Sequence, residues 1–334
     1  MSPNKNIQLK FSKIILIGGG ELLLYTATVL KKKKVDFSIL VSNRHSVEKF
    51  RDLSFLDFLK KKKIDYKVIA NINSNNLNIK NIIRPNSLAI CFGPSWIFSK
   101  KILKLFNYNM FNINLIPLPK YMGGAHFTWQ ILNNNFEGGI YFQKITDKLD
   151  QGPILLGKRF KIKKIKNPTP LYFFNQNIKY GKKFIDILVI KIIKNFRFQM
   201  KDFKKKYLSR EYFPRLLSKK NAFINWSWST KEIIDFCNAF DSPYSGAMTF
   251  YKKNKIFLKN VSLFQKKKFH PFVSGIIIKI IKTDIYVATN EGIIKIGVCL
   301  KSQTNINKSM RQGQRLITPH KYIDAGFLYI PKFN

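Results

Sequence analysis

The chain contains the stretch Asn112-Ile113-Asn114-Leu115-Ile116-Pro117-Leu118-Pro119-Lys120-Tyr121-Met122-Gly123-Gly124-Ala125-His126. Residues 110–115 are predicted to form a strand, and alternate residues of a strand point the same way, so Asn112 and Asn114 share one face. A second stretch, Lys148-Leu149-Asp150-Gln151-Gly152-Pro153, is predicted to be a loop after the next strand. Polar side chains on this strand and in the loop after the next strand indicate a site.

The sequence around this stretch alternates between short apolar strands and helices. Residues 13–17 form a β-branched run that stops at Gly18-Gly19-Gly20, and residues 21–30 read as a helix. Further strands are expected at 37–41, 66–69, 87–92 and 139–145, and helices at 50–62, 99–106, 125–133 and 168–195. This order predicts an α/β fold with a Rossmann-like, doubly wound parallel sheet.

The glycine triplet has two interpretations. It could belong to a nicotinamide or flavin site, but the full G-x-G-x-x-G spacing is absent because Leu23 and Leu24 follow Glu21. The alternative is a tight turn in which glycines relieve steric conflict and expose amide groups at a helix N-terminus.

The pattern changes after residue 200. Short strand-like runs at 247–250, 256–263, 275–281, 285–289 and 293–298, with one helix at 229–240, predict a small β-barrel. We therefore expect an α/β domain over residues 1–200, a linker over 201–215 and a β-barrel domain over 216–334.

Composition describes a globular and strongly basic protein of 334 residues, with 45% hydrophobic residues and a formal charge of +42. The lysine tracts at 31–34, 60–63, 204–206 and 266–268 are dispersed, which favours a solvated surface, although a tRNA or a nucleotide-linked substrate is compatible with the charge. Cys91, Cys237 and Cys299 lie far apart, so neither a zinc spacing nor a disulfide framework is expected. We expect a cytoplasmic protein without a membrane segment.

The two quoted stretches resemble the active-site signature of the folate-dependent formyltransferases, the family of the methionyl-tRNA and nucleotide-sugar enzymes. Their signature has an Asn-x-His pair, a Leu-Pro-x-Tyr/Trp turn and a later Leu-Asp-x-Gly. The family's histidine is replaced by Asn114 here. The runs 223–227, 241–247 and 271–275 are similar to the family's C-terminal domain, so the resemblance covers nearly the whole chain.

The resemblance implies a catalytic group of Asn112, Asn114, His126 and Asp150. Asn112 could donate a hydrogen bond to the oxyanion that develops on the formyl oxygen, and Asp150 could orient a water molecule or accept the amine proton through it. Asn114 can donate a hydrogen bond but cannot exchange a proton as histidine does. His126 could supply the missing imidazole, or it could bind a substrate phosphate, or it could simply pack.

The resemblance also implies a binding site for N10-formyltetrahydrofolate, the formyl donor, with no metal. The loop that contains Phe92, Gly93 and Trp96 is expected along the pterin ring, and Asp147 and Leu149 are expected in the loop that faces it. The loop that contains Phe92, Gly93 and Trp96 follows the carboxyl end of a parallel strand, which is where ligands of such sheets bind.

Formyl transfer to a primary amine is therefore the expected function. A nucleotide-linked amino sugar is favoured over methionyl-tRNA as the acceptor, because Met122 stands where the tRNA-acting members usually carry Arg. Two other classes are open: a catalytically impaired protein that binds folate or a nucleotide, and a nucleic-acid-binding module driven by the charge.

Overall fold

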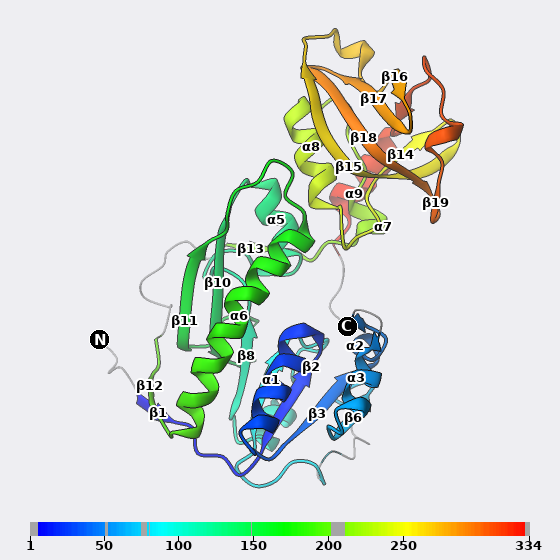
Figure 1. The fold of residues 1–334 in the computed structure, drawn as a ribbon. Coiled ribbons are helices and arrows are strands. Elements are labelled where there is room, and N and C mark those ends of the chain that lie inside the picture. The colour runs from blue at the N-terminus through cyan, green and yellow to red at the C-terminus, as the bar shows by residue number, and fades with distance from the viewer. Residues whose placement is uncertain are drawn as a thin grey trace.

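The computed structural model describes residues 6–50, 53–74, 79, 81–147, 149–201 and 211–330. It has an N-terminal lobe built on a mixed sheet and a C-terminal lobe built on a curled antiparallel sheet (Figure 1). Residues 202–210, which include most of the expected linker and one lysine tract, lie outside the described residues. We propose the two lobes as the two domains.

The N-terminal sheet has seven strands in the order β11-β10-β8-β7-β2-β3-β6. The strands from β8 to β6 pair in parallel, whereas β10 and β11 run antiparallel at one edge. The central strands are apolar because both faces of the sheet are covered. Their bounds are β2 Ile14–Gly18, β3 Phe37–Ser42, β6 Tyr66–Ile69, β7 Leu88–Phe92, β8 Met110–Asn114, β10 Glu137–Lys144 and β11 Ile154–Lys161.

Helices cover both faces of this sheet. Helices α1 (Gly20–Lys32), α3 (Phe55–Lys61) and α6 (Pro170–Ile193) bury their apolar residues against one face. Helix α4 (Lys100–Leu105) packs on the opposite face. The doubly wound arrangement predicted from the alternation of strands and helices is thereby confirmed.

Gly18 ends β2 in a conformation that other residues rarely adopt. Its φ is +123°, and a Cβ placed there would lie 2.1 Å from the carbonyl oxygen of Phe92. Gly20 also has a positive φ, +81°, but a Cβ there would have no heavy atom within 4 Å. A side chain at position 18 would therefore cause both backbone strain and a steric clash. A side chain at position 20 would cause backbone strain alone.

We expect Gly18→Ala to lower the free energy of unfolding by about 3 kcal/mol, because β2 and β7 must separate to admit the methyl group. Gly20→Ala is the matched control and should cost about 1 kcal/mol. Urea unfolding followed by circular dichroism measures both. Equal losses in the two variants would show that the contact with Phe92 does not restrict this position.

The C-terminal lobe is an antiparallel barrel with strands in the order β16-β17-β18-β15-β14-β20. An antiparallel bridge between Ile276 and Arg315 joins the two ends of this order. Helix α8 (Thr230–Ala239) begins with a capping box between Ser229 and Glu232 and packs on β15. The strands are β14 Ala247–Tyr251, β15 Asn254–Lys266, β16 Ile277–Ile281, β17 Asp284–Thr289, β18 Gly292–Lys301 and β20 Leu316–Ile317.

The remaining elements are short, with the exception of α9. They are α2 Asn43–Ser46, α5 His126–Leu132, α7 Ser218–Asn221, α9 His320–Leu328, β1 Asn6–Gln8, β4 Lys49–Phe50, β5 Leu53–Ser54, β9 Met122–Gly123, β12 Arg197–Gln199, β13 Tyr212–Phe213, β19 Thr304–Asn305, and two 3₁₀ turns at Pro271–Val273 and Asn307–Ser309. Strand β13 pairs in parallel with β9, so the chain touches the N-terminal lobe again just before it enters the barrel.

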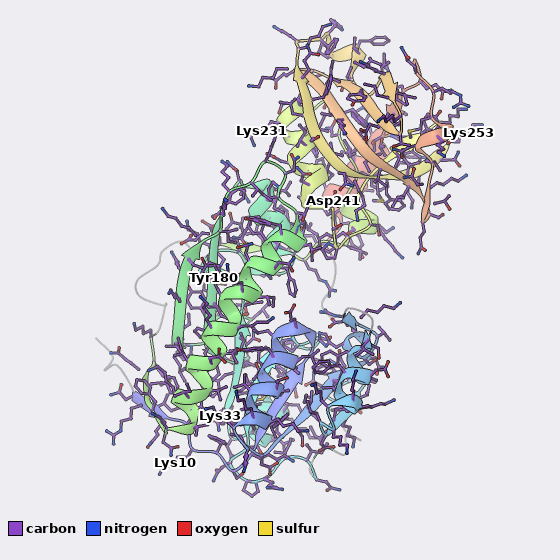
Figure 2. All side chains as sticks on the ribbon, viewed as in Figure 1. Lys10, Lys33, Tyr180, Lys231, Asp241 and Lys253 are labelled. Carbon is purple, nitrogen blue, oxygen red and sulfur yellow. The ribbon has the colours of Figure 1, made fainter. Side chains whose placement is uncertain are left out.

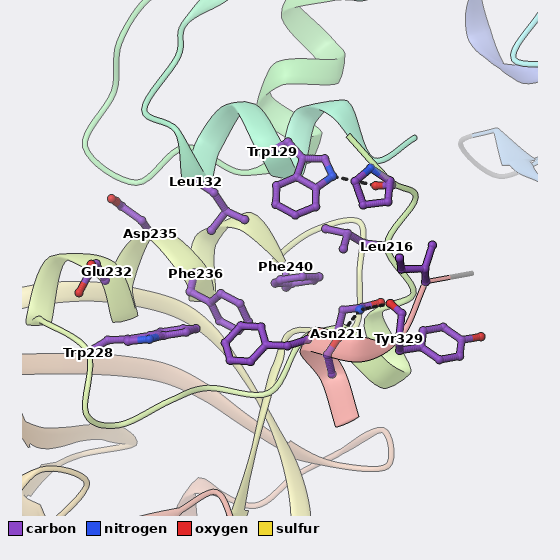
Figure 3. Close-up of a pocket in the computed structure, with 14 residues that line it drawn as sticks. Trp129, Leu132, Leu216, Asn221, Trp228, Glu232, Asp235, Phe236, Phe240 and Tyr329 are labelled. Carbon is purple, nitrogen blue, oxygen red and sulfur yellow. Dashed lines mark hydrogen bonds between the residues drawn. The ribbon is translucent and has the colours of Figure 1, made fainter. Parts of the chain in front are cut away.

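The lobes contact each other through α5 and α8. The hydroxyl of Thr128 donates to the carbonyl oxygen of Ala239 over 3.0 Å. An apolar pocket of about 390 Å³ lies at this junction, with Trp129 on one side and Phe236 and Phe240 on the other (Figure 3). None of the site residues expected from the sequence lines it.

The surface charge is distributed over both lobes. The labelled lysines lie on different sides of the molecule: Lys10 and Lys33 on the N-terminal lobe, and Lys231 and Lys253 on the C-terminal lobe (Figure 2). The three cysteines are buried and free. Across the described residues, the model contains no helix with the length and apolar character that a membrane span needs.

Candidate functional site

The two asparagines of β8 lie on the same face and are hydrogen-bonded to each other. Nδ2 of Asn112 donates to Oδ1 of Asn114 over 2.7 Å. The intervening Ile113 and the preceding Phe111 belong to the buried cluster beneath α1 and α6. The period of the strand therefore directs the amides away from this core, to the face on which the expected site lies.

Asp150 reaches the same place from the loop after β10. Its Oδ1 accepts a hydrogen bond from Nδ2 of Asn114 over 3.1 Å, and its Oδ2 accepts one from the backbone N–H of Gly123 over 3.2 Å. Asp150 has a φ of +52°, a left-handed conformation that aspartate tolerates better than most residues. The carboxyl group of Asp150 is thus held by Asn114, which lies 36 residues earlier in the chain, and by the backbone of Gly123.

Burial raises the pKa of Asp150 above its ordinary value, and the hydrogen bonds from Gly123 and Asn114 oppose this rise. A carboxylate whose pKa is raised takes up a proton more readily than an exposed one. Asp150 is therefore a stronger base than an exposed aspartate and is suited to accept a proton from a bound group.

Gln143 is a further member of this group that the sequence interpretation missed. It lies on β10 directly opposite Asn112 and is almost fully buried. Its Oε1 accepts from Nδ2 of Asn114 over 2.6 Å, and its Nε2 donates to the carbonyl oxygens of Asp150 and Gly152. One signal for it was present in the sequence, since a glutamine follows three apolar residues in a strand whose interior is buried.

These side chains border a small cavity of about 60 Å³, lined by Asn112, Gln143 and Asp150 together with Trp96 and Leu149. Trp96 and Leu149 were expected to bind folate, and the structure brings both to this cavity. Asp147, which was expected beside them, is exposed and is not part of the lining.

A larger cavity of about 570 Å³ lies on the other side of the 92–96 segment. Phe92 and Gly93, also expected to bind folate, line this cavity, as do the glycine turn and His126. The expected folate residues therefore divide between two cavities: Trp96 and Leu149 on the small one, and Phe92 and Gly93 on the large one.

His126 begins α5 and is separated from the amides and the carboxylate. Its Nε2 is buried and has no hydrogen-bond partner within the described part of the chain, and its ring packs against Phe127. Burial lowers its pKa to about 4, so the imidazole is neutral at neutral pH. A neutral imidazole can accept a proton, but the structure shows no hydrogen bond that joins it to Asn114 or Asp150.

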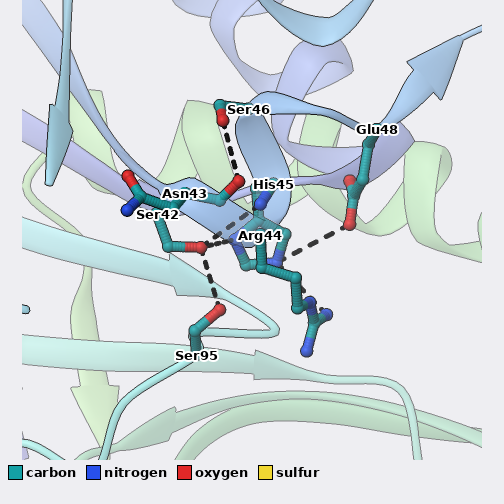
Figure 4. A network of polar contacts seen from close by, with 7 residues as sticks. All are labelled: Ser42, Asn43, Arg44, His45, Ser46, Glu48 and Ser95. Carbon is teal, nitrogen blue, oxygen red and sulfur yellow. Dashed lines mark hydrogen bonds and ion pairs between the residues drawn. The ribbon is translucent and has the colours of Figure 1, made fainter. Parts of the chain in front are cut away.

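A polar network surrounds His45 (Figure 4), and His45 is one of the residues that line the large cavity. The hydroxyl of Ser42 lies 2.8 Å from Nδ1 of His45 and 2.9 Å from the hydroxyl of Ser95. A Cβ at Gly19 would lie 2.5 Å from the His45 ring, so the glycine turn packs directly on the imidazole. The network ties the end of β3 to the glycine turn and to the loop after β7. The sequence assigned no role to this histidine.

Acid should destabilise the fold through His45. Burial, followed by the charge of Arg44, lowers its pKa to about 4 from 6.5. The unfolded chain binds this proton first, so the contribution of His45 to stability is complete above pH 6.5 and is lost as the pH falls toward 4. We expect His45 to account for a loss of about 2 kcal/mol of unfolding free energy between about pH 7.5 and about pH 5.

Chemical unfolding of the wild type and of His45→Gln at the two pH values measures this effect. Glu48, whose pKa is raised by burial, responds to acid in the opposite sense, and the difference between the two proteins isolates the histidine. His320→Gln, on the exposed side of α9, should keep the wild-type pH dependence. An identical pH dependence for His45→Gln would contradict the assignment.

Comparison with known proteins agrees with this architecture. Residues 216–312 match the domain family described as "Formyl transferase, C-terminal domain". The methionyl-tRNA formyltransferase of Clostridium tetani is 30% identical over 207 residues, which cover 62% of this chain and 63% of that protein. The methionyl-tRNA formyltransferase of Malacoplasma penetrans is 26% identical over 86% of this chain and 88% of its own length.

Solved structures of sugar-modifying enzymes have the same fold. The sugar 3N-formyltransferase WlaRD, crystallised with dTDP and 5-N-formyl-THF, superposes with a TM-score of 0.61 at 19% identity and covers 88% of this chain and 99% of its own. The N-formyltransferase of Helicobacter canadensis, in complex with folinic acid and dTDP-3-aminofucose, gives a TM-score of 0.61 at 18% identity over 85% of this chain and 97% of its own.

Residues 216–312 match the C-terminal domain of formyl transferases, and the chain as a whole is similar in sequence and in fold to formyltransferases. The match spans less than two thirds of the first relatives in sequence, 63% of the Clostridium tetani protein and 42% of the Prochlorococcus marinus protein. The similar proteins include both tRNA-acting and sugar-acting enzymes, so the similarity does not choose between these acceptors.

Proposed function

We propose that this protein transfers a formyl group from N10-formyltetrahydrofolate to a primary amine. The observation that carries the proposal is that Asn112 and Asp150 line one small cavity and that Asn114 is hydrogen-bonded to both, in a chain similar to formyltransferases. Formyl transfer needs a hydrogen-bond donor for the formyl oxygen and an acceptor for the amine proton, and this group of side chains contains both.

The residues that line the small cavity suit the edge of a folate, and the cavity itself is narrow. Oδ1 of Asn112 is buried without a partner among the described residues, and Asn112 lines the same cavity as the aromatic side chain of Trp96. A polar atom next to an aromatic face suits a flat heterocycle with N–H groups at its edge. Since about 60 Å³ holds only about two water molecules, we expect the segments that carry Trp96 and Leu149 to separate when folate binds.

The bound donor supplies the formyl group, and the side chains of this chain handle the charge and the proton. One hydrogen of Asn112 Nδ2 is used by Asn114, and the second can donate to the formyl oxygen as the attacking nitrogen forms its bond to the formyl carbon. Asp150 accepts the proton that the amine loses, directly or through a water molecule. The bond between the formyl carbon and N10 then breaks, and tetrahydrofolate leaves with a proton returned to N10. With the donor bound, the apolar side chains of Trp96 and Leu149 would limit the access of water, which would strengthen both interactions.

We propose that the acceptor enters through the large cavity. A volume of about 570 Å³ is typical of sites for nucleotide-sized ligands, and the cavity combines the glycine turn with Arg44 and Lys49. A nucleotide-linked amino sugar and the aminoacyl end of methionyl-tRNA both present a primary amine. We favour the sugar because Met122 stands at the position where the tRNA-acting enzymes usually carry Arg.

The test is formyl transfer by the purified full chain. The protein is incubated with N10-formyltetrahydrofolate and either a dTDP-amino sugar or methionyl-tRNA, and the formylated product is identified by mass spectrometry. Product formation that is saturable in both substrates is the expected result. Tight folate binding without transfer to either acceptor would instead support a binding protein that has lost turnover.

A further inference from the structure

The amide of Gln143 has only one possible orientation. The atom assigned as Nε2 lies 3.0 Å from the carbonyl oxygen of Asp150 and 2.8 Å from that of Gly152. Both partners are acceptors, so the amide must present its nitrogen to them. Its oxygen therefore faces the opposite way, toward Asn114.

The orientation of Gln143 determines that of the two asparagines. Asn114 must present its Nδ2 to Oε1 of Gln143, and this also places the donor beside the carboxylate of Asp150. Oδ1 of Asn114 then faces Asn112, which must present its own Nδ2. Reversal of any one amide would set two oxygens or two nitrogens against each other at less than 3 Å.

The chain of amides ends at the small cavity with Asn112 in one orientation. Its Oδ1 is left buried without a partner among the described residues, at a typical cost of about 1–3 kcal/mol, and one hydrogen of its Nδ2 is left for a ligand. Without the upstream hydrogen bonds, rotation of the Asn112 amide could relieve this cost. The unpaired oxygen is therefore held in place by the rest of the group.

We propose that Gln143 is a positioning residue for formyl transfer, which orients the Asn114 and Asn112 amides so that Asn112 keeps its polar atoms toward the formyl group. This inference rests on the proposed function. An imidazole at position 114 would not need this support, because its two ring nitrogens could bond Asp150 and Asn112 directly. The dependence on Gln143 is thus a consequence of the asparagine at 114.

A double-mutant cycle tests the dependence. Gln143→Met keeps the size of the side chain and removes its polar atoms. We expect it to lower kcat by about tenfold or more in the wild-type background, with the KM for the formyl donor changed by less than about threefold. In the Asn114→His background, the same substitution should lower kcat by less than about threefold.

Gln130→Met is the matched control. Gln130 is buried to the same degree as Gln143, and its Nε2 donates to the carbonyl oxygen of Glu137 over 2.6 Å, away from both cavities. Its substitution makes the same chemical change and should leave kcat unaltered. Equal losses from Gln143→Met in the wild-type and Asn114→His backgrounds would overturn the proposal, because a residue that only stabilises the fold acts alike in both.

A second measurement separates this proposal from the proposed function. Hydrogen exchange of the Asn114 side-chain amide, followed by ¹⁵N nuclear magnetic resonance, should be slow in the wild type and in Gln130→Met, and fast in Gln143→Met. Unchanged exchange in Gln143→Met would overturn the orienting role. If the expected exchange pattern occurs in a protein that formylates neither acceptor, the orienting role stands and formyl transfer is refuted.

Discussion

Substitution Asp150→Asn is expected to lower kcat/KM for formyl transfer by about a thousandfold, within the range that general acid–base groups supply. The amide that replaces the carboxylate cannot accept the amine proton. Its Nδ2 would also face either the N–H of Gly123 or Nδ2 of Asn114, both of which are donors. Steady-state kinetics with saturating formyl donor measure the loss.

The pH profile gives the same substitution a second readout. The carboxylate must be unprotonated to accept a proton, so activity should fall as the pH drops through the raised pKa of Asp150. This acidic limb should lie at a higher pH than for an ordinary aspartate, and it should be absent from the residual activity of Asp150→Asn.

Asp324→Asn, on the exposed surface of α9, controls for the loss of one negative charge and should keep the wild-type rate. A loss of less than about tenfold in Asp150→Asn would show that another group takes the proton. His126, neutral and without a partner among the described residues at the large cavity, is then the next residue to substitute.

Substitution Asn114→His is expected to raise kcat by about tenfold to a hundredfold. An imidazole can donate to Asp150 through one nitrogen and accept from Asn112 through the other, so it occupies the same positions as the asparagine amide. Unlike the amide, the imidazole can also exchange a proton during the reaction. Groups that act as general acids or bases typically raise the rate by at least this factor. Kinetics with the better acceptor measure the gain.

Asn43→His is the matched control for this substitution, because Asn43 is exposed at the start of α2, and it should leave kcat unaltered. A folded Asn114→His protein that is slower than the wild type would mean that the site depends on the asparagine itself. The reaction would then differ from ordinary formyl transfer in the group that it requires at this position.

The arrangement of the N-terminal sheet could largely be predicted from the sequence, because parallel strands covered on both faces are short apolar runs. The strands predicted at 13–17 and 87–92 are β2 and β7, and the helix predicted at 168–195 is α6. Strand β11 was missed. Its second half, Gly157 to Lys161, contains Lys158, Arg159 and Lys161 at an edge of the sheet, so no continuous apolar run marks the whole strand.

The candidate site was predictable in part, for a similar reason. Asn112 and Asn114 share a face because a strand repeats every two residues, which requires no knowledge of the rest of the chain. That Asp150 joins them follows from the family signature. The separation of Phe92 from Trp96 into different cavities depends on how the loop after β7 turns, and residue types alone do not specify that.

The sequence by itself therefore determined the fold class, the family signature and the substitution at position 114, because each of these is written in local order and residue type. Only the tertiary structure decided that Gln143 lies opposite Asn112, and that its hydrogen bonds to two backbone carbonyl groups orient both asparagines. The physical reason is that an amide is symmetric in shape but not in hydrogen bonding. The orientation of Asn114 is settled by a partner 29 residues away, which only the pairing of β8 with β10 brings into contact.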